Sequence, residues 1–283
     1  MLLAVYAAYL LITAADLPAA LSIPLLAVVL AQHSSLQHEV MHGHPFRHRL
    51  LSEATVFPAI GLAIPYGRFR DLHMAHHRTP DLTDPYDDPE TEYLDPAVHA
   101  DLPQPLRWLF AFNRTLAGRM AVGPAISLWR FYRADLARLA AGERSVWLAW
   151  LLHIAGLLPV FLWLTTFGTM ALWQVMVAAY LALSLLKIRT FAEHRAHERF
   201  GARSVIIEDG GPLALLFLNN NLHAVHHAHP GVAWYRLPAL YAERRARYRD
   251  QNGGYIFPTY ASLFARYLVR PKEPVAHPLR PRA

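Results

Sequence analysis

The chain contains no cysteine among its 283 residues. This absence excludes disulfides, thiolate nucleophiles, cysteine-ligated zinc and cysteine-bound iron–sulfur clusters. Any metal must therefore be bound by histidine or carboxylate side chains. The sequence also lacks a recognisable flavin or nicotinamide fingerprint, so it carries no evident electron source of its own.

Charged side chains are scarce as well, at 17% of the residues, whereas 54% are hydrophobic. That balance is typical of a membrane protein rather than of a soluble enzyme. The net charge of +6 is compatible with nucleic-acid binding, but the arginines lie beside apolar segments rather than in one basic, aromatic-rich block. We therefore expect a membrane-surface role for them and no nucleic-acid partner.

The longest stretch without charge, residues 146–186, is long enough for two membrane-spanning helices of about 20 residues each, with a turn at 167–169. Residues 2–31 carry one charge, Asp16, and favour two short spans over one long tilted one. No lysine or arginine precedes this first apolar run, which argues against a secretory signal peptide. The sequence thus predicts about four transmembrane helices.

Two further apolar stretches, residues 57–66 and 120–129, are too short to span a bilayer and are expected at its interface or as re-entrant segments. Arginine and lysine flank the predicted hairpins but are absent from the turn at 167–169. By the positive-inside rule, the long connections and the C-terminal third are cytoplasmic. We predict an all-α polytopic membrane protein, a single domain over residues 1–283, with a cytoplasmic histidine-rich helical cap.

Seventeen histidines are present, and eight of them recur at helical spacing. One pair is four residues apart, and two triplets have the spacing i, i+3, i+4, which places each group on one side of a helix. A lone histidine is usually a packed or hydrogen-bonded side chain, but this repetition is not explained in that way. The groups are His38 and His42; His73, His76 and His77; and His223, His226 and His227.

If the predicted hairpins form, all three groups emerge on the same side of the membrane, where eight imidazoles can converge. Zinc takes about four ligands, so eight are too many for one such ion. Imidazole suits zinc, copper, iron and nickel. The number of ligands therefore indicates two metal ions, and their type leaves the element open.

The runs QHEVMHG, LHMAHHRTPD and NNNLHAVHH, in this order and separated by apolar segments, resemble the three histidine boxes of the membrane-bound fatty acid desaturase and hydroxylase superfamily. The likeness covers roughly residues 30–240. It implies two iron ions, dioxygen as co-substrate and desaturation of a fatty acyl chain in a lipid. A hydroxylase or oxidase of fatty acid, alkane or carotenoid chains is the alternative within the same superfamily.

The segment RTFAEHRAHE, residues 189–198, is similar to the region where many members supply one further histidine ligand. The resemblance implies His194 as the ninth ligand, with His197 as the fallback, and no catalytic residue separate from the ligands. The expected metal ligands are His38, His42, His73, His76, His77, His194, His223, His226 and His227.

Carboxylates often orient metal-bound imidazoles by accepting the other ring N–H. Candidates for this role, chosen by proximity in the sequence, are the carboxylates Glu39, Asp71, Asp84, Asp88 and Glu193. Asn220 and Asn221, just before the third histidine group, are further candidates for supporting the site. For most of the acidic loop, DLTDPYDDPETEYLD at residues 81–95, a solvated surface is at least as good an interpretation. The two asparagines fit a helix cap or a metal-linked water equally well. Structural roles are expected for the other histidines, among them His33, His44, His48, His99, His153, His229 and His277.

Taken alone, HEVMH at residues 38–42 also matches the zinc-protease signature, in which Glu39 is the general base. The extended motif requires a glycine where this chain has Pro45, and proline cannot adopt the positive φ that glycine allows there. A membrane zinc metalloprotease is therefore a remote alternative. A metal transporter should carry its ligands midway along its spans, whereas the clustered histidines lie almost entirely outside the apolar runs.

The electron donor is expected to be a ferredoxin or a small cytochrome with its reductase. Such donors are often acidic, so the run RRARYR at residues 244–249 is a candidate docking patch. Contact between this basic run and anionic lipid heads explains it equally well.

Overall fold

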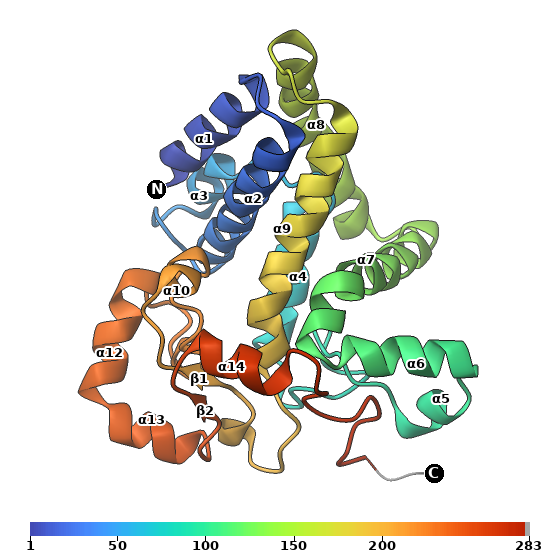
Figure 1. The fold of residues 1–283 in the computed structure, drawn as a ribbon, viewed down its shortest axis with the longest axis vertical. Helices are drawn as coiled ribbons and strands as arrows, with labels where there is room; N and C mark the ends of the chain where they lie inside the picture. Colours follow the sequence, from blue (N-terminus) through green and yellow to red (C-terminus); the bar gives the residue numbers. More distant parts are fainter. Residues whose placement is uncertain (281–283) are drawn as a thin grey trace. The chain divides into compact units, whose positions relative to one another are not determined.

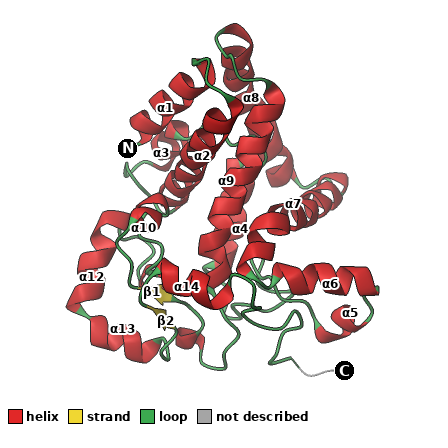
Figure 2. Cartoon of the chain, in the orientation of Figure 1, coloured by secondary structure: helices red, strands yellow, loops and turns green. Residues whose placement is uncertain are grey.

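The computed structural model describes residues 1–280 and is built almost entirely of helices (Figures 1 and 2). Within the described residues the only strands are β1, Ile206–Ile207, and β2, Ile256–Phe257, which pair in parallel. The predicted helical class is confirmed. The chain divides into two compact units, the first formed by residues 1–71 and 124–186 and the second by residues 72–123 and the chain from 187 onward.

Three described helices are long and apolar enough to cross a membrane: α2, Ala19–Met41; α8, Arg144–Thr166; and α9, Leu172–Glu193. On α8, Leu158 and Leu162 are 66% and 69% exposed, as expected for side chains that face lipid. The N-terminal run does form two helices, but α1, Leu2–Ala14, has 13 residues and is shorter than the roughly 20 a span requires. A fourth span and the membrane side of each loop remain predictions.

The first unit consists mainly of apolar helices. Trp163 Nε1 donates to Thr13 Oγ1 at 2.9 Å and ties α8 to α1. Residues 57–66, predicted at the interface or as a re-entrant segment, are irregular chain up to the start of α4, whereas residues 120–129 lie within a long helix. Besides α1, α2 and α8, the helices of this unit are α3, Arg49–Thr55, and parts of α4, Tyr66–His76, α7, Leu116–Ala140, and α9.

A buried ion pair holds α4 against α7 within the first unit. Arg68 Nε and Nη2 donate to the Asp135 carboxylate at 2.9–3.1 Å, and both side chains are 2% exposed. Trp150 Nε1 donates to the same carboxylate at 2.9 Å. These bonds satisfy a charge that burial would otherwise make very costly.

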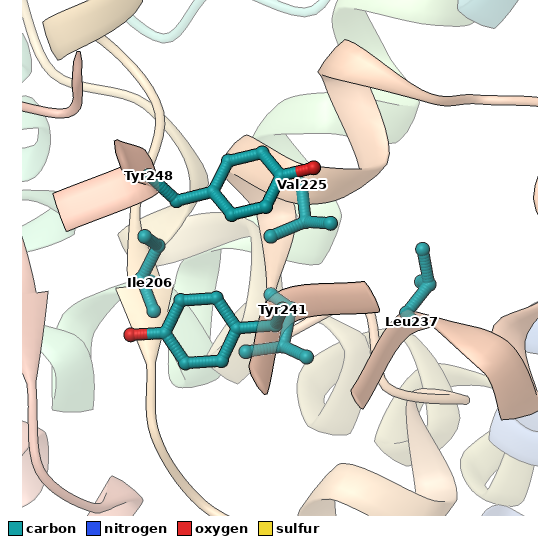
Figure 3. Close-up of a cluster of buried hydrophobic side chains, with 6 residues drawn as sticks. Ile206, Val225, Leu237, Tyr241 and Tyr248 are labelled. Atoms are coloured by element: carbon teal, nitrogen blue, oxygen red, sulfur yellow. The ribbon is translucent and has the colours of Figure 1, made fainter. Parts of the chain in front are cut away.

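The second unit contains short helices around the two strands. Ile206, Val225, Leu237, Tyr241 and Tyr248 pack together in its hydrophobic core (Figure 3). This core joins β1 to α11, so it fixes the helix that carries the third histidine box. The elements that lie wholly in this unit are α5, Pro96–Ala100; α6, Gln104–Asn113; η1, Phe200–Ala202; β1; α10, Pro212–Leu216; α11, His223–Ala228; η2, Trp234–Arg236; α12, Leu237–Glu243; α13, Arg245–Gln251; β2; and α14, Tyr260–Tyr267.

Candidate metal centre

Four histidine side chains converge in the second unit. His76 lies in the last turn of α4, His194 directly follows α9, and His223 and His227 lie one turn apart on α11. One nitrogen from each ring lies within 4.8 Å of the others. His194 Nε2 is 3.0 Å from both His76 Nε2 and His223 Nε2, close to the ~3.4 Å between ligands of a tetrahedral ion with ~2.1 Å bonds.

The outer nitrogen of His76 is held by a buried carboxylate. Asp88 Oδ1 lies 2.7 Å from His76 Nδ1, and both side chains are 1% exposed. Because a carboxylate only accepts hydrogen bonds, Nδ1 of His76 must carry a proton. In the neutral ring, the lone pair on Nε2 therefore points toward His194.

The outer nitrogen of His223 is fixed through an asparagine. Asn220 Nδ2 donates to Glu193 Oε1 at 3.2 Å, which turns the amide oxygen toward His223 Nδ1 at 3.0 Å. That oxygen can only accept, so His223 Nδ1 donates and its Nε2 presents a lone pair to the cluster. Glu193 thus acts on His223 mainly through Asn220, at a direct distance of 3.6 Å.

The donor set fits a cation. His76 Nε2 and His223 Nε2 both face His194 Nε2 at 3.0 Å. If His76 carries a second proton, on Nε2, it can donate that proton to His194 Nε2. The lone pairs of His194 Nε2 and His223 Nε2 then still face each other, unless the proton of His194 is on Nε2. His227 Nε2 is buried and has no hydrogen-bond partner among the described residues. An ion bound by all four rings relieves both the repulsion and the unmet bond.

Burial controls the charge of three of these rings. It lowers the pKa of His194, His223 and His227 well below the ordinary value, and the neighbouring imidazoles lower it further. Such rings are neutral at physiological pH, which is the form that binds metal.

His76 has the opposite shift. Burial alone would lower its pKa, but Glu90 and Asp88 outweigh burial and raise the pKa to about 9. The two carboxylates therefore favour positive charge at this point of the cluster. The same field stabilises a bound metal cation.

A second group of histidines lies in the same unit. His77 Nε2 is 3.0 Å from His73 Nε2 and 3.2 Å from His226 Nε2. Glu90 Oε1 accepts from His73 Nδ1 at 2.9 Å, so the His73 lone pair faces His77. The imidazole–carboxylate arrangement of the first group is thus repeated around a different set of rings.

The first histidine box lies in the first unit, at the end of α2. The rings of His38 and His42 are 4.8 Å apart, as expected for residues one helical turn apart. His38 is buried, and so is the neighbouring Glu39.

Three residues predicted to support the ligands have other partners. Asp84 accepts from the backbone of Tyr86 and Asp87 and forms an ion pair with Arg280, so it shapes a loop. Asp71 is paired with arginine side chains of the first unit. Asn221 donates to the carbonyls of Ile207 and Asp209 and holds the backbone before α11.

Of the two residues predicted as the ninth ligand, His194 lies in the cluster. His197 has a different partner: its Nδ1 accepts from the Arg199 backbone N–H at 3.0 Å. Among the other histidines, His153 Nε2 donates to the Leu62 carbonyl at 2.9 Å, a structural bond of the kind predicted for it. Sequence reasoning missed Glu90, whose only signal was its place in the acidic loop.

The tight turn before the third box is also specified locally. Leu218 and Asn219 both have positive φ, at 51° and 56°. This conformation is tolerated by asparagine and is unfavourable for leucine. Asn219 Nδ2 donates to the Trp234 carbonyl at 3.1 Å and helps to hold the strained backbone from which α11 begins.

Comparison with known proteins identifies the family. The family model described as fatty acid desaturase matches residues 15–259, a segment that contains all three boxes and His194. A search of curated proteins found no match. Because the match spans far more than half of the sequence, the chain belongs to the fatty acid desaturase family.

Proposed function

We propose that the protein desaturates a fatty acyl chain of a lipid, using dioxygen, at a histidine-bound diiron centre. Family membership makes the chain an oxidoreductase of the desaturase and hydroxylase type. The observation that carries the proposal is the convergence of His76, His194, His223 and His227, with one ring nitrogen of each within 4.8 Å of the others. The apolar helices α2, α8 and α9 favour an integral membrane location beside a lipid substrate.

In this proposal the four-histidine group holds one iron, and the remaining five predicted ligands hold the other. His73, His77 and His226 already lie together, and His38 and His42 are proposed to complete their site. Imidazole ligands alone do not distinguish iron from zinc, copper or nickel. Iron is proposed because the family reaction is an oxidation, whereas zinc does not change its oxidation state.

When bound, the two irons would supply the redox chemistry that removes hydrogen from an unactivated methylene. The balanced desaturation converts CH₂–CH₂, dioxygen, two electrons and two protons into CH=CH and two water molecules. The chain's own residues prepare the ligands for this reaction. Asp88 and Glu90 hold the outer N–H groups of His76 and His73, and Asn220 holds that of His223, so that each ring keeps one orientation and one tautomer.

The electrons are proposed to come from an external donor, a ferredoxin or a small cytochrome with its reductase, because the chain has no cysteine and no recognisable flavin or nicotinamide fingerprint. The arginines of the run at residues 244–249 are exposed on and beside α13, which supports either donor docking or contact with anionic lipid. Arg245 already donates two hydrogen bonds to Glu208 at 2.8–2.9 Å. The positive-inside pattern supports an active site on the cytoplasmic side.

Hydroxylation or another oxidation of a fatty acid, alkane or carotenoid chain is the alternative within the family. It uses the same ligands and differs in how the substrate is placed. The family match also favours the interpretation of HEVMH as a histidine box over the zinc-protease interpretation.

The test is to express the protein in a host with a simple lipid profile and to analyse extracted acyl chains by mass spectrometry. We expect new double bonds that disappear in the His73→Ala variant and persist in His48→Ala, a matched change at an exposed histidine. Hydroxylated chains would move the assignment to the alternative. An unchanged profile together with peptide cleavage by a one-zinc protein would overturn both.

A further inference from the structure

The C-terminal strap, defined here as residues 271–280, lies beyond the segment that the family model matches. It follows α14 as irregular chain. Val275 and His277 within it are buried, and the Lys272 side chain is 8% exposed. No predicted ligand and no recognised motif falls in it. Its contacts nevertheless reach two of the segments that position the four-histidine group, the chain at His194 and the acidic loop that contains Asp88.

The first contact is with the ligand His194. Lys272 Nζ donates to the backbone carbonyl of His194 at 2.5 Å and to Tyr255 Oη at 3.2 Å. Glu273 Oε1 accepts from the Ala196 backbone N–H at 3.3 Å. His194 lies after the last residue of α9, so helical hydrogen bonds do not fix its backbone carbonyl. The strap supplies that restraint.

The second contact is with the acidic loop that orients His76. The strap residues Val275 and His277 bond to Leu94 through backbone groups, at 3.0 and 2.8 Å. His277 Nε2 is 3.2 Å from Thr83 Oγ1. The backbone N–H of Thr83 in turn donates to Asp88 Oδ2 at 2.8 Å, so the strap is two bonds away from the carboxylate that holds His76.

The strap is anchored at both ends to the same unit. Lys272 N donates to the Arg114 carbonyl at 2.9 Å, and Arg114 Nε donates to the Glu273 carbonyl at 3.0 Å. At the other end, Arg280 pairs with Asp84 at 2.7 Å and with Asp95 at 3.4 Å. Because both of its ends are bonded to the second unit, the strap can hold the backbone of His194 and the loop of Thr83 and Asp88 at a fixed spacing.

We propose that the C-terminal strap is a positioning element of the metal centre, with Lys272 and His277 as its positioning residues. It holds the backbone of His194 and the loop of Asp88 at the spacing that one ion needs. The inference rests on the proposed function, because it assumes that these histidines bind metal. It predicts that residues outside the histidine boxes control the affinity of one metal site and leave the other intact.

The test is a Co²⁺ titration of the full-length, metal-free protein in detergent, followed by visible absorption. We expect Lys272→Met to weaken one of two Co²⁺ sites by about tenfold or more, the usual effect of losing an outer-shell partner. The matched control is Arg270→Met, which removes an exposed positive charge two residues away. Lys272→Arg should recover most of the affinity, because arginine can still donate to the His194 carbonyl.

His277→Gln provides an independent variant at the other end of the strap, in case Lys272→Met fails to fold as judged by circular dichroism. It should weaken the same Co²⁺ site, through Thr83 and Asp88. Wild-type affinity at both sites in folded Lys272→Met or His277→Gln protein would overturn the strap proposal. Failure of the wild-type protein to bind two Co²⁺ ions would instead overturn the proposed metal centre.

Discussion

Replacing Asp88 by asparagine tests the physical reasoning behind the four-histidine group. Both Asp88 oxygens accept hydrogen bonds: Oδ1 from His76 Nδ1 and from the Glu90 backbone N–H, and Oδ2 from the Thr83 backbone N–H. An amide of the same size has only one oxygen. In either orientation, the Asp88→Asn amide places an NH₂ group against a donor, and it removes the negative charge beside His76.

The expected magnitude follows from the hydrogen bonds and the charge that the substitution removes. Removing an outer-shell carboxylate weakens metal binding by about 10- to 100-fold, which corresponds to about 1.4–2.7 kcal/mol. The buried donor left without an acceptor should cost the metal-free protein about 1–3 kcal/mol in its free energy of unfolding. We therefore expect the Asp88→Asn variant both to bind metal more weakly and to have a lower free energy of unfolding in its metal-free form.

The assay is iron binding by the purified, reconstituted protein, with metal content measured by mass spectrometry. Asp87→Asn is the matched control, since it removes the same charge from the neighbouring, exposed residue. We expect iron loss from the Asp88 variant alone. Equal iron content and equal affinity in the wild type and the Asp88→Asn variant would refute the idea that this carboxylate orients His76.

Two further predictions concern the first unit. Arg68→Met leaves Asp135 buried without its cation, so we expect a loss of about 3–5 kcal/mol in the free energy of unfolding, measured as reduced thermal stability in detergent. Gly156→Ala places a Cβ 2.5 Å from the Phe57 carbonyl oxygen. We expect this overpacking to lower the free energy of unfolding by about 1–3 kcal/mol, measured as a lower melting temperature. Gly61→Ala is the control, because no atom lies within 4 Å of the added Cβ.

For Arg68, the double variant Arg68→Met with Asp135→Leu should regain much of the lost stability, because no unpaired charge is left. A single variant as stable as wild type would contradict the assignment of this pair as structural. For Gly156, equal melting temperatures of the two alanine variants would show that α8 is not constrained by the Phe57 carbonyl.

The long apolar helices could be predicted because charge is excluded from residues 146–186, and a bilayer core tolerates few charges. The N-terminal run was harder to divide. Its two helices, α1 and α2, are separated at residues 15–18, where Pro18 precedes the start of α2. Only α2 is long enough to span, because helix length depends on where the chain turns rather than on composition alone.

The histidine groups were predictable because helical periodicity fixes which side chains share a face. The groups that hold their outer nitrogens were only partly predictable. Asp88 and Asn220 are predicted from proximity in sequence and do contact His76 and His223, whereas Glu90 lies in the loop after α4, 17 positions from His73 in the sequence. Such contacts depend on the fold of an irregular segment. Its sequence has no periodic pattern from which side-chain positions could be predicted.

The strap illustrates the same limit. Lys272 is 78 residues from His194, and nothing in the surrounding sequence resembles a metal-site motif. The role proposed for Lys272 rests on contacts that only the folded chain creates, above all its hydrogen bond to the His194 carbonyl. Residues of this kind are found through the ligands that they touch.

Iron stoichiometry is the most direct measurement of the metal centre. The metal-free wild-type protein should be reconstituted with ferrous iron without oxygen, freed of excess metal and analysed for iron per chain, alongside His194→Ala. We expect two irons in the wild type and about one in the variant, because His194 belongs to only one of the two groups. A wild type that retains no iron, or a variant that retains two, would contradict a diiron centre built from these histidines.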